Sequence, residues 1–420
     1  MKKLNGQSRE CIGKIKLMVN SIKKNLSKIS IWDLLGVFVF LLLLIPSLIV
    51  RLINKLMGKR VWLVCEHRTA RDNGYVFYKY LKENHPEINS YYAMKKSGID
   101  YEKVKNYGNI LQWGSISHYF IYMTAEWNIS SHKNGNPNEL LFLLLQRGFG
   151  LYGNMIFLQH GVLYQDFSMF HKKNCNFKLF ICGAKPEYEF VNKYFGYKDE
   201  VKYTGLARFD QLYNKTPDNK TILYIPTWRR WLDDEEKFLS SEYFSRIEDV
   251  LNDSELDKLL IKENKQLYFY PHFAFWKYSH LFSTNNKNIK ILDPRETDIQ
   301  QLLMTCSLLI TDYSSIATDF SYMKKPIIYY QFDFIDYYEK HCQTEKNNNT
   351  AKPYFKFEKD GFGPVVHEKQ ELLKVIAKLL ETKFSLDPIY QKRIDSFFEL
   401  HDNHNCDRIY NEISKLRNQD

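Results

Sequence analysis

Short apolar runs alternate with amphipathic stretches along most of the chain. From residue 61 onward, runs of five to seven residues rich in Val, Ile, Leu, Phe and Tyr are typical of buried strands. We predict strands at 61–65, 90–94, 154–159, 179–183, 222–227, 266–272, 289–293, 307–311 and 326–331. Helical spacing separates several of them, at 73–84, 297–306 and 369–381. This alternation predicts an α/β fold with parallel sheets covered by helices on both faces.

A polar stretch divides this pattern into two halves of similar size. Residues 214–221 read NKTPDNKT, a composition typical of a domain boundary. We therefore predict two doubly wound domains facing a cleft, one at 61–215 and one at 216–420. The last stretch, 386–420, is polar and helical in pattern. We expect its terminal helix to pack back across the seam.

One apolar run indicates a membrane-associating helix. Residues 34–50 hold seventeen residues without a charge, which is short for the roughly 20 that a transmembrane helix needs. Pro46 can kink or break a helix at this point. We favour a monotopic or peripheral anchor. A single span is the first alternative, and a signal peptide, for which no A-x-A-like cleavage site follows, is the second.

The net charge of +10 is concentrated beside this apolar run. Residues 1–30 carry eight Lys or Arg against a single acid, Glu10, and the far flank carries Arg51, Lys55, Lys59 and Arg60. Positive flanks on both sides favour the cytoplasmic face of the cell membrane. We assign 1–60 as a basic N-terminus with an apolar anchor beside an anionic membrane surface. No recognition motif accompanies the charge, which argues against a nucleic-acid partner.

Cysteine usage and the common motifs exclude several classes of protein. The seven Cys are scattered with no CxxC pair, which fits a reducing compartment and argues against structural zinc. The sequence contains no GxxxxGK[ST], GxGxxG, HExxH or DxD motif, so P-loop ATPases, dinucleotide dehydrogenases and zincins have no support. With no evident carboxylate pair for Mg²⁺, we expect neither a metal nor a cofactor. Nothing in the sequence predicts an oligomeric state.

Two histidines follow predicted strands, one in each half. His160 and Gly161 come after the strand at 154–159, and His272 ends the strand at 266–272. Ligands of open α/β sheets bind beyond the carboxyl ends of strands, and imidazole is suited to general-base work. Each could equally be an ordinary loop or strand-end residue. Together they could face each other across a cleft.

Three further motifs carry candidate phosphate-binding or cleft residues. The strand at 307–311 runs into Thr311, Asp312, Ser314 and Ser315, where a helix N-terminus would favour phosphate, although an ordinary strand-to-helix turn has the same pattern. Arg229 follows the strand at 222–227 and could contact phosphate or lie in a solvated basic turn. Before the seam, Arg208 and Asp210 could form a structural pair or shape the cleft together with Gly161.

Taken in order, these segments resemble the CDP-glycerol glycerophosphotransferase family, which includes teichoic-acid primases and polymerases. The resemblance covers roughly residues 61–415 and is most specific at 308–330. The other matching stretches are LQHGV (158–162), TGLARFDQL (204–212), ILYIPTWR (222–229), YPH (270–272), GFGPVV (361–366) and HDNHNCDRIYNEI (401–413). Residues 65–92 look like a branch of the family found in surface-polysaccharide loci.

The resemblance implies a GT-B-like fold of two Rossmann-type domains, with the acceptor on the N-terminal domain and the CDP-linked donor on the C-terminal one. It implies that His160 is the general base and that His272 binds donor phosphate or assists the leaving group. Residues at the donor's phosphates are expected to be Thr311, Asp312, Ser314, Ser315, Arg229 and Arg408.

The implied reaction transfers glycerol-phosphate, or a related polyol-phosphate, from CDP-glycerol or CDP-ribitol to a hydroxyl of a lipid-linked or glycan acceptor, with release of CMP. Gln159, Pro271 and Asn403 depart from residues common in the family, which leaves the acceptor open. One alternative is a GT-B glycosyltransferase that uses a nucleotide sugar for capsule or surface polysaccharide. The other is a non-catalytic scaffold in polysaccharide assembly.

Overall fold

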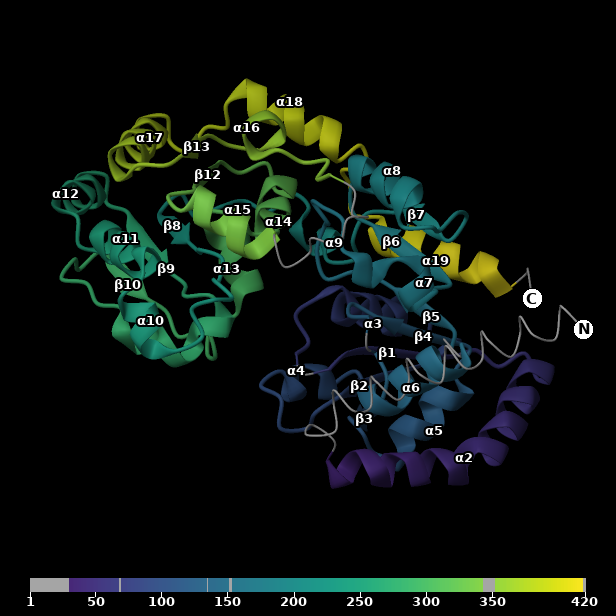
Figure 1. Cartoon of the computed structure of the whole chain (residues 1–420). Coiled ribbons are helices and arrows are strands. Elements are labelled where there is room, and N and C mark those ends of the chain that lie inside the picture. Colours follow the sequence, from purple (N-terminus) through teal and green to yellow (C-terminus); the bar gives the residue numbers. More distant parts are fainter. Residues whose placement is uncertain (1–29, 68, 134, 151–152, 343–351, 418–420) are drawn as a thin grey trace, which may run out of the picture.

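Two parallel α/β domains make up the molecule (Figure 1). The computed structural model of this chain describes residues 30–67, 69–133, 135–150, 153–342 and 352–417. The N-terminal sheet has the order β3-β2-β1-β4-β5-β6-β7, and every neighbouring pair is parallel. Its strands are β1 Val61–His67, β2 Asn89–Met94, β3 Ile110–Gln112, β4 Trp127–Ser130, β5 Met155–Phe157, β6 Leu179–Cys182 and β7 Val201–Tyr203.

The C-terminal sheet is also fully parallel, with the order β10-β9-β8-β11-β12-β13. Its strands are β8 Thr221–Tyr224, β9 Gln266–Phe269, β10 Ile289–Ile291, β11 Leu308–Thr311, β12 Ile327–Tyr330 and β13 Val365–Val366. In both sheets the first strand lies inside and the order reverses beside it, which is the doubly wound arrangement. The predicted fold class is confirmed. Four strands, β3, β4, β7 and β13, were not predicted.

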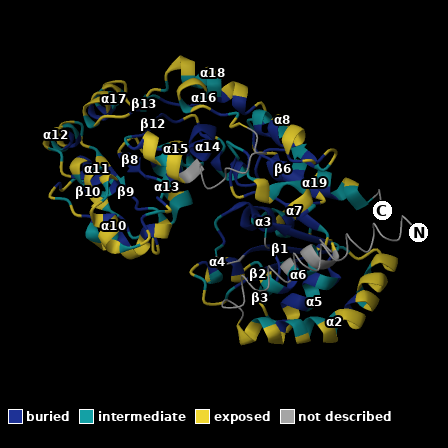
Figure 2. Ribbon diagram, viewed as in Figure 1, coloured by how far each residue is buried: buried dark blue, intermediate teal, exposed yellow. Residues whose placement is uncertain are grey.

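Helices cover both sheets, and buried residues fill the strands between them (Figure 2). The N-terminal domain has α3 Asn73–Asn84, α4 Tyr101–Lys105, α5 Ile116–Thr124, α6 Glu139–Phe149, η2 Ser168–Phe170, α7 Lys172–Cys175, α8 Lys185–Tyr194 and α9 Phe209–Leu212. The C-terminal part has α10 Glu235–Leu239, α11 Glu242–Leu251, α12 Ser254–Lys262, η3 Phe273–Leu281, α13 Ile299–Thr305, α14 Ile316–Tyr322, α15 Phe334–Cys342, α16 Phe357–Asp360, α17 Lys369–Glu381, α18 Pro388–Phe397 and α19 Asn405–Leu416.

The two domains share an apolar junction. The rings of Phe209 on α9 and Tyr322 on α14 stack with centroids 4.2 Å apart, and Phe398 packs edge-on against both. All three residues are buried. Stacked and edge-on aromatic pairs bury large areas with defined geometry. The junction therefore fixes how α14 of the C-terminal domain lies beside the N-terminal domain.

Helix α19 returns to the N-terminal domain, as Figure 1 shows. The Asp210 carboxylate accepts hydrogen bonds from the backbone N–H groups of Asn405 and Cys406, at 2.8 and 2.9 Å. These N–H groups belong to the first turn of the helix, which has no intrahelical acceptors for them. Further along, Arg60 donates to the Tyr410 hydroxyl at 3.1 Å. The C-terminal helix thus holds the two domains together.

Helix α2, Ile31–Leu56, lies along the N-terminal domain rather than apart from it (Figure 1). Val37, Phe40 and Leu43 repeat at helical spacing and pack against the cluster that includes residues of α5 and α6. At Gly36 an added Cβ would lie 2.2 Å from the Tyr119 hydroxyl oxygen, so only glycine allows this approach. Pro46 lies inside the helix, which gives a physical reason for the bend visible in Figure 1.

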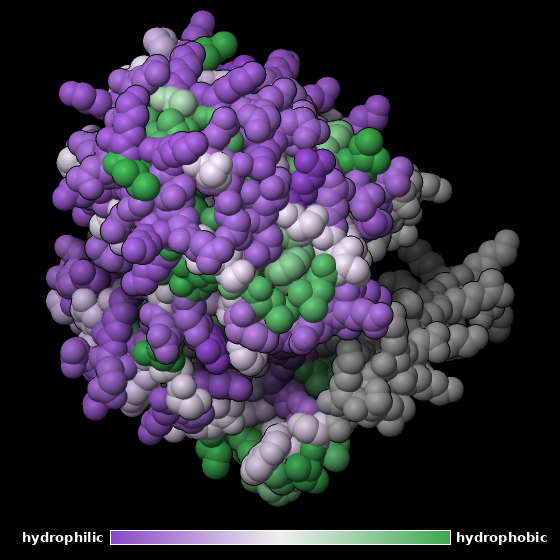
Figure 3. Space-filling view, turned by 90° about the vertical axis from the view of Figure 1, so that its left-hand side faces the viewer, coloured by the Kyte–Doolittle hydropathy of each residue, from purple (hydrophilic) through white to green (hydrophobic). Residues whose placement is uncertain are grey.

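The other face of α2 is apolar and exposed. Its large exposed side chains include Trp32, Leu41, Ile45, Leu48 and Leu52. Length and hydropathy would also allow this helix to cross a membrane. Apolar residues appear along the lower edge of the molecule in Figure 3, where α2 lies, whereas the face of the C-terminal domain is largely hydrophilic. One face of α2 therefore packs against the N-terminal domain, and its opposite face is apolar and exposed.

Candidate active site

A strained turn presents His160 beyond the end of β5. Gln159 has φ of 62°, in the left-handed region that is uncommon for residues other than glycine. Its buried side chain donates to the Ile181 carbonyl oxygen at 2.6 Å and to Glu187 Oε1 at 3.0 Å. Backbone strain of this kind costs roughly 1–3 kcal/mol and persists only where the surroundings enforce it. The side-chain amide supplies that enforcement and fixes the direction of His160.

Glu187 supports the same turn from beneath. Its carboxylate accepts the backbone N–H groups of Leu163 and Gly183, at 2.6 and 2.7 Å. Burial raises the pKa of Glu187 to about 7, against the lowering effect of these hydrogen bonds. The loop after β5 is therefore bound to the loop after β6 through one buried carboxylate.

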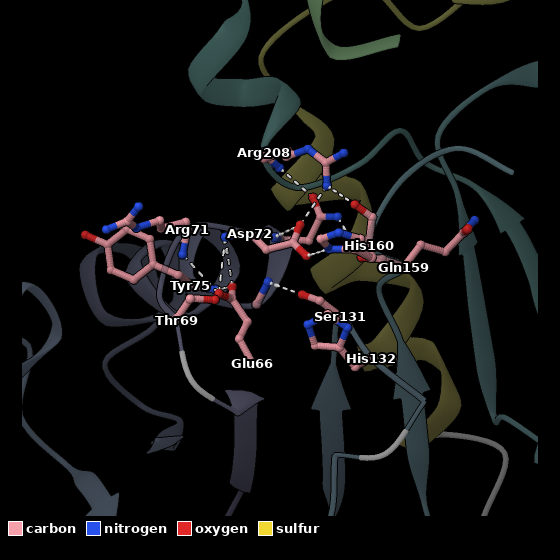
Figure 4. Close-up of polar contacts among 12 residues, drawn as sticks. Glu66, Thr69, Arg71, Asp72, Tyr75, Ser131, His132, Gln159, His160 and Arg208 are labelled. Carbon is pink, nitrogen blue, oxygen red and sulfur yellow. Dashed lines mark hydrogen bonds and ion pairs between the residues drawn. The ribbon is translucent and has the colours of Figure 1, made fainter. Parts of the chain in front are cut away.

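His160 is paired with Asp72, which caps α3 after β1. The two side chains point toward each other in Figure 4, and His160 Nδ1 lies 2.5 Å from Asp72 Oδ2. This bond places a proton on Nδ1 and leaves Nε2 as the free acceptor. The His160 side chain is 72% exposed, whereas Asp72 is buried. A histidine oriented by a buried carboxylate, with its second nitrogen open, is the arrangement of a general base.

Asp72 and His160 shift each other's pKa. Burial alone would raise the pKa of Asp72, but the positive charges of His160 and Arg208 outweigh it and lower the pKa to about 2. The ionised carboxylate in turn raises the pKa of His160 above its ordinary value. Asp72 therefore stays negative across the physiological range, and His160 becomes a stronger base than a free imidazole.

Arg208 supports this pair from the other side of Asp72 (Figure 4). Its Nη1 donates to Asp72 Oδ1 and to the His160 carbonyl oxygen, both at 2.6 Å. Its backbone N–H donates to Asn73 Oδ1 at 3.0 Å, and Asn73 Nδ2 donates to the Gln159 carbonyl oxygen at 2.8 Å. Arg208, which was expected to shape a cleft, is thus bonded directly to His160 and Asp72.

A second histidine, His132, lies beside His160 after β4. The ring centroids are 5.1 Å apart, and the ring atoms of both lie within 4.8 Å of an Asp72 oxygen. Burial and the charge of His160 lower the pKa of His132, so it is neutral near pH 7. Since Asp72 and His160 are already in direct hydrogen-bond contact, we assign the group as an acid–base cluster.

The loop of His160 also meets the C-terminal domain. An added Cβ at Gly161 would lie 3.0 Å from Ser315 Oγ, so the glycine allows the two domains to approach closely here. Ser315 precedes α14 and makes no side-chain cap, while Ser314 Oγ accepts the Ile316 N–H at 3.3 Å. Both serines are partly exposed. The structure therefore brings the His160–Gly161 loop close to Ser315, with Ser314 next to it in the chain, where the two domains meet.

His272 precedes η3 and its side chain caps that helix. Its Nδ1 accepts the Ala274 N–H at 3.1 Å, and its ring stacks near Trp228 with centroids 6.3 Å apart. Burial lowers the pKa of His272 to about 4, and the charge of His160 contributes in the same direction. A neutral imidazole that accepts at Nδ1 carries its proton on Nε2. His272 is therefore a hydrogen-bond donor at neutral pH, not a cation.

Arg229 and Asp312 are placed differently from the prediction. Arg229 is fully buried, and its guanidinium donates to Asp333 at 2.7 and 2.9 Å and to Asp312 at 2.9 Å. Asp312 also accepts the Thr227 N–H at 2.8 Å. Neither side chain can reach a phosphate, because each is enclosed and already paired. Their expected phosphate contacts are wrong, and the two residues instead brace the loop after β8.

Two further predictions, for Thr311 and Asp210, are corrected in the same way, and Arg408 has structural partners of its own. The Thr311 hydroxyl is buried and donates to the Ile225 carbonyl oxygen at 2.7 Å, so it ties β11 to β8. Arg408 donates to the Thr204 carbonyl oxygen at 2.8 Å and pairs with Asp402 on both nitrogens, so it anchors α19. Asp210 caps α19 and is not a cleft residue. In each case a partner distant in sequence takes up the polar group.

Asp72, His132 and Asp319 lie in this candidate site but were not predicted from the sequence. Asp72 lies within 65–92, a stretch noted only for its resemblance. His132 follows β4 just as His160 follows β5, but β4 is four residues long and was not predicted. Asp319 lies within α14, where a charged residue ordinarily faces solvent. No apolar run ends directly before Asp72 or His132, so their place beyond a strand end was not visible in the sequence.

Comparison with known proteins decides the family. A family model described as CDP-Glycerol:Poly(glycerophosphate) glycerophosphotransferase matches residues 48–415. The chain belongs to this family. The resemblance found in the sequence is therefore confirmed, and the junction of the two domains around His160 is the candidate active site of a glycerophosphotransferase-family chain.

Relatives of this glycerophosphotransferase-family chain act in teichoic acid synthesis. This chain is 32% identical over 378 residues to the minor teichoic acid biosynthesis protein GgaB of Bacillus subtilis (strain 168). The match covers 86% of this chain and 40% of that protein. The chain is 24% identical over 380 residues to the teichoic acid poly(glycerol phosphate) polymerase of the same organism, covering 82% and 47%. The chain spans less than half the length of these relatives.

Solved structures agree on the fold of this family member. The wall teichoic acid polymerase TagF, in a His-to-Asn variant soaked with CDPG, matches with a TM-score of 0.63 and 18% identity, covering 93% of this chain and 99% of that one. A putative UDP-N-acetylglucosamine 2-epimerase from Listeria monocytogenes matches with a TM-score of 0.55 and 13% identity, covering 86% and 98%. At these identities the likeness concerns the two-domain fold alone.

Proposed function

We propose that this chain transfers glycerol-phosphate, or a related polyol-phosphate, from a CDP-linked donor to a hydroxyl of a lipid-linked or glycan precursor of a cell-surface polymer. The observation that carries the proposal is the His160–Asp72 pair, which leaves Nε2 of His160 open and lies on a loop that approaches Ser315 at Gly161. Membership of a glycerophosphotransferase family supports the class of donor. A general base next to a phosphate site is what phosphoryl transfer to a hydroxyl requires.

The reaction is an in-line displacement at phosphorus. The acceptor hydroxyl oxygen attacks the phosphorus that bears the polyol, and His160 Nε2 takes the hydroxyl proton. The bond from that phosphorus to the CMP oxygen breaks, CMP leaves with the electron pair, and a phosphodiester forms. Asp72 stabilises the imidazolium that results. The chain's main contributions are positioning and charge stabilisation.

His272 acts as a neutral donor in this scheme. Its Nδ1 is used by Ala274, so Nε2–H is the group that can reach a ligand. A hydrogen bond from this N–H to a donor phosphate oxygen would stabilise charge that develops on the leaving CMP. Because burial lowers the pKa of His272 to about 4, this donor is present throughout the neutral range. Ser314 and Ser315 would supply further hydroxyl donors to the diphosphate.

A donor panel tests the proposed function. Purified protein is offered CDP-glycerol, CDP-ribitol and a UDP-sugar with a polyol-phosphate acceptor, and released nucleotide is measured. We expect CMP from a CDP-polyol, no UDP, and no loss of rate in a chelator, because we propose that no metal or cofactor takes part. Release of UDP would support the glycosyltransferase alternative, and release of neither nucleotide would favour a scaffold.

We also propose that α2 anchors the chain to the cytoplasmic face of the cell membrane. Its outward face is a continuous apolar stripe, and cationic residues lie on both sides of it in the sequence. An apolar face that enters the lipid boundary beside basic residues is typical of interfacial helices. Teichoic acid synthesis by the relatives supports a place at the membrane.

Introducing charged residues on the exposed apolar face of α2 should weaken the binding of the chain to lipid. We expect the double variant Leu41→Asp, Leu48→Asp to lose most of its co-sedimentation with anionic vesicles and to keep its thermal stability, since both side chains are about 60% exposed. Ile261→Asp, at a similarly exposed position on α12, serves as the matched control and should bind vesicles like the parent. Equal binding by all three proteins would exclude α2 as the anchor.

A further inference from the structure

The base has one support that comes from the other domain. Arg208 holds Asp72 with Nη1, and its remaining nitrogens turn toward Asp319 on α14. Arg208 Nε lies 3.0 and 3.1 Å from the two oxygens of Asp319, and Nη2 lies 2.9 Å from Oδ1. Asp72, Arg208 and Asp319 are all buried. One guanidinium is therefore shared between a carboxylate of the N-terminal domain and one of the C-terminal domain.

This sharing determines which oxygen of Asp72 is left for the base. Arg208 uses only Nη1 on Asp72, at Oδ1, so Oδ2 remains available to His160 Nδ1. A guanidinium prefers to grip a carboxylate with two parallel bonds. Without Asp319, the released nitrogens could take both oxygens of Asp72 and compete with His160. The bidentate grip of Asp319 prevents this rearrangement.

The same helix end connects the base to the donor side. Asp319 lies one helical turn after Ser315, whose hydroxyl oxygen approaches Gly161. Helix α14 thus begins beside Ser315, a candidate phosphate contact, and carries Asp319, the partner of Arg208, one turn later. Any shift of α14 relative to the N-terminal domain would change both contacts together.

We propose that Asp319 is a positioning residue for the reaction, which couples docking of the donor domain to the orientation of His160 through Arg208 and Asp72. The proposal rests on the proposed function, in which His160 is the base. It predicts that His160 is correctly oriented only when α14 is in place. Donor binding and base competence would then be parts of one event.

The charged groups around His160 set the direction of the pH effect. They are Asp72 from the loop before α3, His132 after β4, Arg208 before α9, Asp319 on α14 and His272 before η3. Asp319 and Asp72 raise the pKa of His160, and Arg208 lowers it. Removing the negative charge of Asp319 leaves the Arg208 cation less compensated. The pKa of His160 then falls, and the acid limb of the rate profile moves to lower pH.

Two substitutions of Asp319 separate charge from packing. We expect Asp319→Asn to lower kcat about 10-fold or more, with little change in KM for CDP-glycerol, and to move the acid limb to lower pH. Asp319→Glu keeps the charge, so its acid limb should stay near that of the parent even if kcat falls. Asp395→Asn, exposed on α18, is the control and should match the parent. Identical acid limbs in the parent and the Asn variant would overturn the proposal.

A double variant tests whether the effect passes through His160. In the His160→Ala background, Asp319→Asn should cause no further loss of the residual rate, because no base is left to position. An undiminished further loss would show a separate, merely structural role. NMR titration of the His160 ring gives a readout that needs no substrate: its pKa should be lower in Asp319→Asn than in the parent. If the parent releases no CMP but this shift is seen, the proposed function fails and the coupling stands.

Discussion

Replacing His160 with Ala should lower kcat for CMP release by roughly 10²–10⁴-fold, the usual effect of losing a positioned general base. The protein should fold normally, because the side chain is largely exposed and the turn is held by Gln159 and Glu187. The measurement is CMP release from CDP-glycerol together with a thermal unfolding curve. His280→Ala, at an exposed position at the end of η3, is the matched control and should retain full rate.

The pH dependence gives this prediction a second measurement. A base works only when unprotonated, and Asp72 raises the pKa of His160. The rate should therefore fall as the pH drops through a value above the roughly 6.5 of an ordinary histidine. Asp72→Asn removes the charge that raises this pKa, so its acid limb should move to lower pH. A His160→Ala variant with the rate of the parent would show that another group accepts the proton.

Replacing Arg229 with Met should lower the free energy of unfolding by roughly 3–5 kcal/mol, the range for breaking one side of a buried ion pair. Arg229 is fully buried between Asp312 and Asp333, and its guanidinium lies near the rings of Tyr243, Tyr313 and Tyr337. Removing the cation leaves two buried carboxylates without their partner. Urea unfolding of the parent and the variant measures the difference.

The neighbouring arginine is a close control for this prediction. Arg230 is exposed and follows Arg229 directly in the chain. Arg230→Met should change the free energy of unfolding by less than about 0.5 kcal/mol, as surface substitutions usually do. If Arg229 contacted donor phosphate instead, Arg229→Met would keep its stability and raise KM for CDP-glycerol. That result would restore the role first expected for it.

Local pattern was enough for the fold and for part of the site. The apolar runs that became β1, β5, β6, β8, β11 and β12 are buried strands, so their apolar composition directly reflects a buried environment. His160 was found because it directly follows such a run, at the sheet edge where ligands bind. Ser314 and Ser315 were predicted for the same reason, because they follow the run that became β11. Each of these inferences needs only residues that are neighbours in the chain.

The partners of these residues could not be found in the same way. Asp72 is 88 positions from His160, and Asp319 is 111 positions from Arg208. Arg229 looked like a phosphate ligand because its neighbours end a strand, yet its partner Asp333 lies 104 positions away and buries it. Whether a charged side chain is free for a ligand depends on what packs around it, and sequence order does not contain that information.

The sequence by itself thus determined the two parallel domains, the apolar helix with its basic flanks, the family and the strand-end position of the base. These follow from periodicity and local composition, which act through the nearest neighbours of each residue. Only the tertiary structure decided which polar groups are open and which are paired. It joined His160 to Asp72 and Arg208 to Asp319, and it enclosed Arg229, because long-range packing sets both burial and the pairing of charges.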